Sequence, residues 1–243
     1  MKFLIIGDSW GIGEYAITNQ LMKPVPHTGI DHYLQCHGHT VENISAGSAS
    51  NFGQLRHCRT VLEQADSMPD YIIWFHTEPV RDIADTVIDD ELDGPVQFPL
   101  INSLEDFDQA MQYINYQNYA FAETIHSQFH CPFIAIGGLG KLHSCIESFS
   151  FARYKIYSWA KEMLQSADLP DNILSRNREK EIINQFKFTK ESIINAIDAS
   201  RHYQELLKNS PKFPDGLHPA RSEYESLCHR ILTCLASYQL NSI

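Results

Sequence analysis

Short apolar runs alternate with longer amphipathic segments along the 243 residues of the chain. Three runs are apolar almost throughout, which is typical of strands buried on both faces of a sheet, and a fourth candidate strand follows a Gly-His turn. These predicted strands are 2–6, 40–45, 71–75 and 133–136. Because strands alternate with helices, we expect a three-layer α/β/α fold around a mostly parallel sheet, of the flavodoxin-like type.

The helices expected between these strands are marked by periodicity and by capping residues. Residues 50–65 place apolar side chains three and four positions apart, and Ser50 or Asn51 can cap that helix. Ser103 and Asp106 resemble a capping box at the start of a long helix. The predicted helices are 10–22, 30–36, 50–65, 103–129 and a last one after His218.

Residues 141–210 interrupt the alternation, because they are polar, mostly helical in pattern and poor in strand signals. No linker rich in Pro, Ser or Gly divides the chain into independent halves. We therefore expect one domain over residues 1–243, with a mainly helical insertion at about 141–210 that forms a cap or a flank.

Composition and charge narrow the possible partners. Acidic residues outnumber basic ones, 30 to 19, and the formal net charge of −11 disfavours a nucleic-acid partner and an anionic membrane surface. The acidic stretch 82–93 is interpreted as a solvated loop rather than as a cation site. Cys36-His37-Gly38-His39 is interpreted as a turn, because two histidines supply only part of a zinc site, so no metal is expected.

The start of the chain predicts a strand rather than a secretion signal. A single lysine and a short apolar run precede Gly7, and a signal peptide needs a longer apolar region. No apolar stretch approaches the length of a transmembrane helix. We therefore expect a cytoplasmic protein, and the sequence leaves its oligomeric state open.

Two short motifs at opposite ends of the chain supply the parts of a hydrolytic triad. Ser9 follows the first predicted strand in a Gly-Asp-Ser tripeptide, and Asp215 and His218 form an Asp-x-x-His motif near the C-terminus. A serine hydroxyl is a weak nucleophile until a base accepts its proton, and that base needs a carboxylate to hold its tautomer. We expect Ser9 to be the nucleophile, His218 the base and Asp215 the carboxylate. The simpler alternatives are that Ser9 is only a helix cap and that Asp215 and His218 lie in a proline-bounded surface turn.

In these motifs the chain resembles the GDSL, or SGNH, hydrolase superfamily. The tripeptide ending at Ser9 matches the block that carries the nucleophile of that family, and the proline-flanked Asp215 and His218 match its last block. Gly47 fits the glycine that follows the second strand. The resemblance implies an SGNH-hydrolase type of fold, a small-molecule or carbohydrate ester as substrate and no cofactor. It also implies that the backbone N–H groups of Ser9 and Gly47 bind the oxyanion.

The third block of the family is altered in this chain. The family usually has an asparagine after the third strand whose side chain donates to the oxyanion, but the segment here is His76-Thr77-Glu78-Pro79. An ionised carboxylate has no proton to donate and repels an oxyanion. Three interpretations stay open: burial keeps Glu78 protonated, Thr77 or His76 donates instead, or the site has lost ordinary ester hydrolysis. The expected oxyanion hole therefore includes Thr77 and Glu78.

Three further residues are candidates for substrate binding. Trp10 could line a pocket, although aromatic residues beside strands more often belong to the core. Asn51 could reach the site, although its role as a helix cap is favoured. Arg81 could bind an anionic substrate, pair with Glu78 or lie on the surface.

These features favour a serine hydrolase that cleaves an ester, as an acylhydrolase or esterase, with carbohydrate deacetylation as one candidate reaction. The alternative is a binding or structural protein on the same fold whose oxyanion hole has decayed, and Glu78 is its main support. A nucleotide binder is disfavoured, because Gly7, Gly11 and Gly13 do not form the dinucleotide fingerprint.

Overall fold

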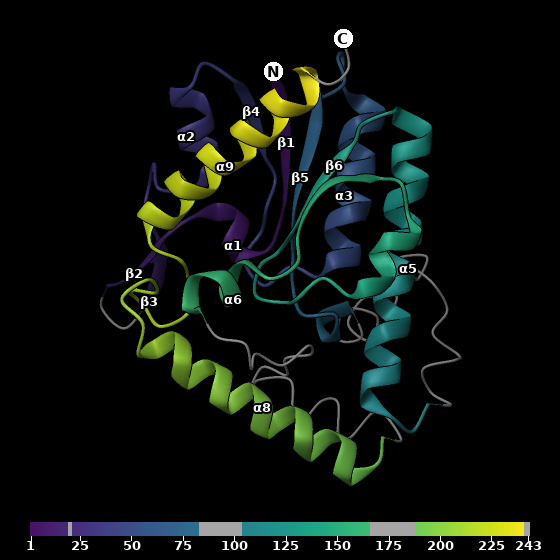
Figure 1. Cartoon of the computed structure of the whole chain (residues 1–243), viewed down its shortest axis with the longest axis vertical. Coiled ribbons are helices and arrows are strands. Elements are labelled where there is room, and N and C mark those ends of the chain that lie inside the picture. Colours follow the sequence, from purple (N-terminus) through teal and green to yellow (C-terminus); the bar gives the residue numbers. More distant parts are fainter. Residues whose placement is uncertain (19–20, 83–103, 166–187, 241–243) are drawn as a thin grey trace.

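The computed structural model describes residues 1–18, 21–82, 104–165 and 188–240. Its strands are β1 (Lys2–Gly7), β2 (Tyr15–Thr18), β3 (Leu21–Pro24), β4 (Thr40–Asn43), β5 (Tyr71–His76), β6 (Phe133–Gly137) and β7 (Ala152–Ile156). Its helices are α1 (Ser9–Ile12), α2 (Ile30–Cys36), α3 (Asn51–Gln64), α5 (Phe107–Phe129), α6 (Trp159–Leu164), α8 (Lys190–Lys208) and α9 (Arg221–Leu240), with a 3-10 turn η2 (Ser144–Ser148). Figure 1 shows their arrangement.

The central sheet has five strands in the order β4-β1-β5-β6-β7, and all of its neighbouring pairs are parallel. β1 pairs with both β4 and β5, so it lies where the order reverses. Numbered along the chain, the order is 2-1-3-4-5, which is that of the flavodoxin-like folds. The predicted α/β/α fold is confirmed. In such sheets ligands bind at the carboxyl ends of the strands beside the reversal.

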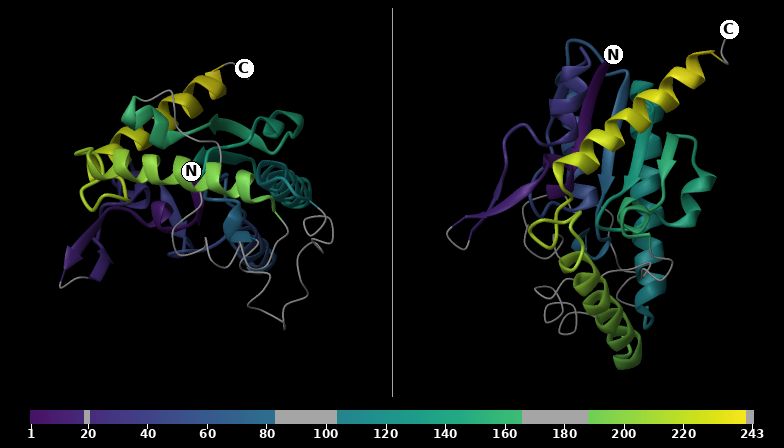
Figure 2. Two further views of the ribbon diagram at one scale, coloured as in Figure 1. Left: turned by 90° about the horizontal axis from the view of Figure 1, so that it is seen from below. Right: turned by 60° about the vertical axis from the view of Figure 1, so that its left-hand side comes forward.

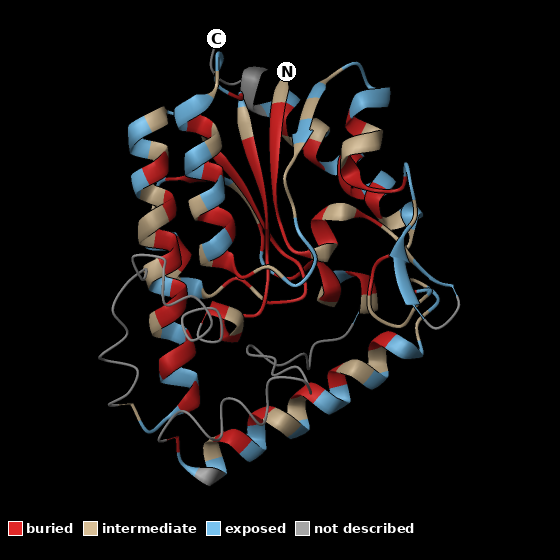
Figure 3. Ribbon diagram, turned by 180° about the vertical axis from the view of Figure 1, so that it is seen from behind, coloured by how far each residue is buried: buried red, intermediate tan, exposed pale blue. Residues whose placement is uncertain are grey.

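Alternate residues of each strand belong to two apolar cores on opposite faces of the sheet. Phe3 and Ile5 of β1 pack with α2, α6 and α9, whereas Leu4 and Ile6 pack with α3 and α5. The views of Figure 2 show the helices covering both faces, and Figure 3 shows the buried residues concentrated in the sheet between them. Because both faces are covered, the central strands are apolar along their whole length.

Helices α3 and α5, for which the sequence predicts capping residues, both begin with a side-chain cap. Ser50 accepts a hydrogen bond from the N–H of Gly53 (3.1 Å) and caps α3. Asp106 accepts one from the N–H of Gln109 (2.9 Å) and caps α5. Asp106 is thus itself the cap, and Ser103, the cap predicted for this helix, lies outside the described residues.

The segment after α1 is a β-hairpin and not the helix predicted for residues 10–22. α1 ends at Gly13, whose φ of 136° favours glycine, and a Cβ there would lie 2.7 Å from the backbone nitrogen of Gly29. β2 and β3 then pair antiparallel and project from the body of the domain, as the right-hand view of Figure 2 shows. The close approach of two backbones at Gly13 therefore outweighs a weak helical pattern.

The region predicted to be a helical insertion contributes a strand to the sheet. β7 lies within residues 141–210 and pairs with β6 at the edge. Its sequence, Ala-Arg-Tyr-Lys-Ile, is partly polar because an edge strand is only half covered, so it lacks the apolar run of the other strands. The mainly helical region expected here thus contains a strand that the sequence did not mark, and the insertion at about 141–210 stays a prediction. α8, also in this region, runs past the carboxyl ends of the strands in Figure 1.

Candidate active site

The motifs from the two ends of the chain meet at the carboxyl edge of the sheet. Ser9 begins α1 directly after β1, and Asp215 and His218 lie in the loop between α8 and α9. Ser9 Oγ lies 2.8 Å from His218 Nε2, and His218 Nδ1 lies 2.6 Å from Asp215 Oδ2. The three side chains form one chain of hydrogen bonds, in the order that acyl transfer by a serine requires.

The loop holds the Asp215 carboxylate through its own backbone. Asp215 Oδ1 accepts hydrogen bonds from the N–H groups of Leu217 (2.9 Å) and His218 (2.7 Å), which leaves Oδ2 for the His218 ring. Burial by itself raises the pKa of Asp215, but the hydrogen bonds from His218 and Leu217 outweigh it, and the pKa lies below its usual value. The ionised carboxylate accepts the Nδ1 proton and leaves Nε2 free to accept the proton of Ser9.

Asp8, rather than Ser9, caps the short helix α1. Asp8 Oδ1 accepts the N–H of Trp10 at 3.0 Å. Asp8 Oδ2 accepts hydrogen bonds from the Thr77 hydroxyl (2.8 Å) and from Arg81 Nη1 (3.1 Å), and the side chain is fully buried. The Ser9 hydroxyl is therefore not the cap of α1, and the histidine engages it instead.

The backbone N–H groups of Ser9 and Gly47, the oxyanion donors expected from the sequence, lie in two segments that a hydrogen bond joins. The N–H of Ala46 donates to the carbonyl of Gly7 (3.1 Å), which brings the loop after β4 against the end of β1. Gly47 is exposed. Among the residues that the structure describes, the N–H groups of Ser9 and Gly47 have no acceptor. Both can donate to a ligand.

Thr77 does not donate toward this region, contrary to the expectation from the sequence. Its hydroxyl donates to Asp8, and its N–H donates to Asn51 Oδ1 at 2.8 Å. Asn51 Nδ2 in turn donates to the Thr77 carbonyl at 3.0 Å. Both donors of Thr77 are thus committed. Asn51, which is 1% exposed, holds the Thr77 backbone. It is not the helix cap that the sequence favours, because Ser50 caps α3.

Glu78, the other expected member of the oxyanion hole from the third block, is buried and pairs with Arg81. It is 1% exposed, and its Oε2 accepts a hydrogen bond from Arg81 Nε at 3.1 Å. The guanidinium favours the ionised carboxylate, which has no proton to donate. Of the roles left open for Arg81, the structure shows the pairing with Glu78. Arg81 also pairs with Asp8, so its guanidinium contacts two buried carboxylates.

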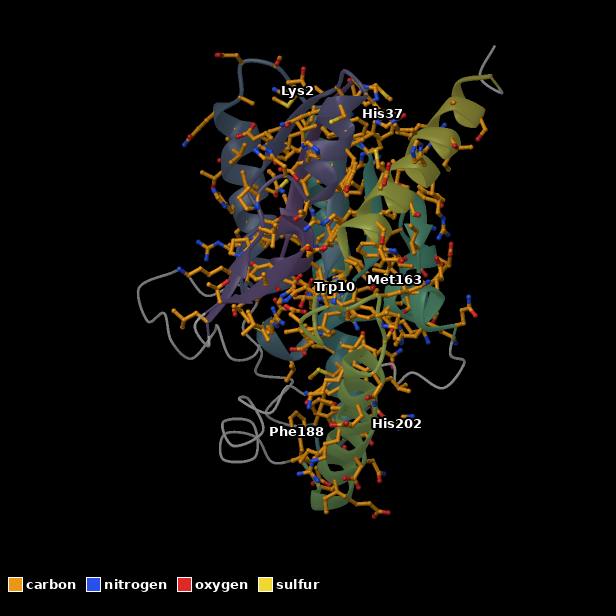
Figure 4. The ribbon with its side chains drawn as sticks, turned by 90° about the vertical axis from the view of Figure 1, so that its left-hand side faces the viewer. Lys2, Trp10, His37, Met163, Phe188 and His202 are labelled. Atoms are coloured by element: carbon orange, nitrogen blue, oxygen red, sulfur yellow. The ribbon has the colours of Figure 1, made fainter. Side chains whose placement is uncertain are left out.

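Trp10 belongs to the core and not to a substrate pocket. It is fully buried, with its ring centroid 5.9 Å from that of Trp159 and 5.8 Å from that of Phe213. Figure 4 labels Trp10 and Met163, which belong to the same apolar cluster. The structure thus removes Trp10 from the predicted substrate-binding residues.

Tyr15 is a site residue that the sequence did not indicate. Its ring stacks on that of His218, with centroids 4.0 Å apart and an interplanar angle of 20°. Burial, and then the charges of Asp8 and Asp215, raise the pKa of the Tyr15 hydroxyl. The sequence does not indicate Tyr15 because its segment is predicted to be a helix, whereas Tyr15 begins strand β2 of the hairpin.

His76, the other candidate donor of the third block, is buried behind the site. It is fully buried, and its Nε2 lies 3.0 Å from Asn115 Oδ1. Burial lowers the pKa of His76 to about 4. The ring is therefore neutral at pH 7 and turned toward α5.

Lowering the pH from 7 to 5 is expected to destabilise the fold by about 2 kcal/mol through His76 alone. The pKa of about 4 in the fold lies below the ordinary value of 6.5, so the unfolded chain takes up the proton first as the pH falls. The stability is complete above pH 6.5 and is lost progressively toward pH 4. Urea unfolding at both pH values measures the loss. His76→Phe should show a correspondingly weaker pH dependence, and an undiminished one would contradict the assignment.

Among the residues that the structure describes, no group of three or more His, Cys, Asp and Glu side chains is arranged to hold a metal ion. In the same ranges, no helix is both long and apolar enough to cross a membrane. The groups gathered at the site are the Ser9 hydroxyl, the His218 ring with the Asp215 carboxylate, and the backbone N–H groups of Ser9 and Gly47.

No model of a known protein family matches the sequence, and no curated protein matches it. Among solved structures, the psychrotrophic esterase EstA from Pseudoalteromonas sp. is 12% identical over 99% of this chain and 98% of its own, with a TM-score of 0.48. A lipase/acylhydrolase from Enterococcus faecalis is 12% identical over 98% of this chain and 96% of its own (TM-score 0.39). A carbohydrate esterase is 11% identical over 97% of this chain and 64% of its own (TM-score 0.46). The assignment of a function therefore rests on the geometry of the site.

Proposed function

We propose that this chain is a serine ester hydrolase, a divergent member of the GDSL/SGNH superfamily with an altered third block. The observation that carries the proposal is the chain of hydrogen bonds from Ser9 Oγ through His218 to Asp215. The simpler interpretations fit less well, because Asp8 caps α1 in place of Ser9 and because His218 is only 3% exposed.

In the proposed reaction Ser9 Oγ attacks the ester carbonyl carbon while His218 Nε2 accepts the hydroxyl proton. The carbonyl oxygen becomes an oxyanion that accepts hydrogen bonds from the N–H groups of Ser9 and Gly47. Cleavage of the ester bond releases the alcohol, which takes the proton from His218 and leaves the acyl group on Ser9. Water then attacks the acyl group with His218 again as the base, and the carboxylic acid leaves. Asp215 stabilises the imidazolium in both halves.

The proposed substrate is a small-molecule or carbohydrate ester, and the reaction needs no cofactor. Deacetylation of a carbohydrate and hydrolysis of a small acyl ester use the same steps at Ser9. The net charge of −11 disfavours nucleic acid and anionic membranes as partners.

A binding or structural protein without turnover is the second candidate. The observation that favours it is the pairing of Glu78 with Arg81, which leaves the third block without an oxyanion donor. A protein that only binds its ligand, however, does not require a serine, a histidine and an aspartate that are joined by a chain of hydrogen bonds.

A fluorophosphonate probe separates the two candidates without knowledge of the substrate. An activated serine attacks the phosphorus and fluoride leaves, so we expect a covalent label that peptide mass spectrometry maps to Ser9. Ser9→Ala should remove the label, whereas Ser222→Ala, at an exposed serine of α9, should keep it. A folded wild-type protein that takes no label would overturn the hydrolase proposal.

Glu78→Gln is expected to lower both stability and turnover. Glutamine keeps the shape of the side chain but removes the charge opposite Arg81, and a hydrogen bond to a charged group contributes about 1.5–3 kcal/mol. Arg81 then holds Asp8 and the α1 turn less firmly. Urea unfolding and initial rates on p-nitrophenyl acetate measure the two effects, with Glu63→Gln in an exposed ion pair as the control. Faster turnover than wild type would show instead that the carboxylate faces the oxyanion.

A further inference from the structure

The oxyanion site has two backbone donors and no side-chain donor from the third block. Thr77 donates to Asp8 and Asn51, and Glu78 accepts from Arg81. One oxyanion donor is typically worth roughly 10²–10³-fold in kcat. A donor supplied by another element would therefore have a large effect on turnover.

Tyr15 places a hydroxyl group beside the same loop. Its Oη lies 3.9 Å from the position that a Cβ would take on Gly47. Its ring lies flat on His218, at 4.0 Å between centroids. Within the described parts of the chain, Tyr15 Oη makes no hydrogen bond. Its proton is available to a ligand atom bound beside Gly47 and the histidine.

Contacts of the preceding residue, Glu14, hold the chain at Tyr15 in this position. The neighbouring Glu14 accepts hydrogen bonds from the N–H of Arg221 (2.8 Å) and from its Nη2 (2.8 Å). The N–H of Glu14 donates to Thr28 Oγ1 at 3.1 Å. Arg221 begins α9 just after His218. The base of the hairpin and the histidine loop are thus tied together, which keeps the phenol over the imidazole.

We propose that Tyr15 is the side-chain donor of the oxyanion hole, in place of the asparagine that the third block lacks. The inference rests on the proposed hydrolase function. In the tetrahedral intermediate the Tyr15 O–H donates a hydrogen bond to the oxyanion beside the N–H groups of Ser9 and Gly47, and the proton stays on the tyrosine. The raised pKa of Tyr15 keeps the hydroxyl protonated at the pH values at which a histidine base works.

The stack on His218 suggests a second role for Tyr15, which is to position the histidine ring. A residue with only that role would need the aromatic ring but not the hydroxyl group. Phenylalanine at position 15 preserves the stack and removes the donor, whereas leucine removes both. Tyr15→Phe and Tyr15→Leu therefore separate donation to the oxyanion from positioning of the histidine.

The test compares wild type, Tyr15→Phe and Tyr15→Leu on p-nitrophenyl acetate, with Tyr116→Phe, at an exposed tyrosine of α5, as the control. We expect Tyr15→Phe to lower kcat by roughly 10²–10³-fold while KM changes by less than about threefold, because the donor acts on charge that exists only in the transition state. The acid limb of its pH–rate profile should stay in place, because the stacked histidine is unchanged. Tyr15→Leu should shift that limb in addition. Tyr116→Phe should keep wild-type kinetics.

Each contrary result has a separate meaning. Wild-type kcat in Tyr15→Phe, with Ser9 still labelled by the fluorophosphonate, would overturn the inference and leave the hydrolase function standing. A shifted acid limb in Tyr15→Phe without loss of kcat at the optimum would also overturn it, because Tyr15 would then only position His218. A folded wild type with neither turnover nor label would overturn the hydrolase function and this inference together.

Discussion

Substitution of Ser9 by alanine is expected to lower kcat for p-nitrophenyl acetate by roughly 10⁴–10⁶-fold. The substitution removes only the hydroxyl group, and no other described nucleophile lies against His218 Nε2. The melting temperature should change by less than about 2 °C, because the cap of α1 is Asp8 and stays in place. Initial rates and a thermal melt of the same preparation measure both effects.

The partners of Ser9 provide the controls for this result. His218→Ala should lower kcat about as much as Ser9→Ala, and the double variant should lose little more, because the groups act as a unit. His229→Ala, at an exposed histidine of α9, should keep wild-type rates. A large loss of stability in Ser9→Ala would assign the hydroxyl to the fold, and additive losses in the double variant would show that the two residues act separately.

Arg81→Met is expected to destabilise the fold by roughly 3–5 kcal/mol, which corresponds to a melting temperature lower by about 6–20 °C. The side chain of Arg81 is 11% exposed, and those of its partners Asp8 and Glu78 are 0% and 2% exposed. Methionine fills a similar volume but leaves two carboxylates buried without their cation. Removal of one partner from a buried ion pair costs far more than removal from an exposed pair.

Arg59→Met is the matched control for this prediction. Arg59 pairs with Glu63 on α3, where the two side chains are 44% and 45% exposed, and an exposed helical pair contributes only about 0.2–0.5 kcal/mol. Urea unfolding of both variants gives the two values. A loss in Arg81→Met as small as that in Arg59→Met would show that Asp8 and Glu78 need no cation.

The role of the altered third block depends on contacts with other parts of the fold. The glutamate in place of an asparagine raised the question of whether the site could hold an oxyanion, and three interpretations were open. The tertiary structure shows Glu78 paired with Arg81 and Thr77 bound to Asp8 and Asn51. Arg81 lies three residues after Glu78, and their pairing is among the alternatives that the sequence leaves open. Asp8 and Asn51 lie far from Thr77 in sequence, so no local pattern indicates these two partners.

By itself the sequence determined the central strands and the two ends of the candidate site. β1, β5 and β6 are buried on both faces, so their side chains must be apolar in unbroken runs that are visible locally. Ser9 and the Asp215–His218 pair stood out because acyl transfer needs those residue types after a strand and at an Asp-x-x-His spacing.

The tertiary structure alone decided the hairpin, the edge strand β7 and the position of Tyr15. At Gly13 the backbone of Gly29 comes too close for a side chain, and β7 is covered too little to need an apolar sequence. Tyr15 stacks on His218, and the Glu14–Arg221 contact joins the neighbouring residue of the hairpin to the start of α9. Such contacts depend on which distant segments the packed sheet brings together. Hydrophobic periodicity indicates that a side chain is buried, but it does not indicate which residue packs against it.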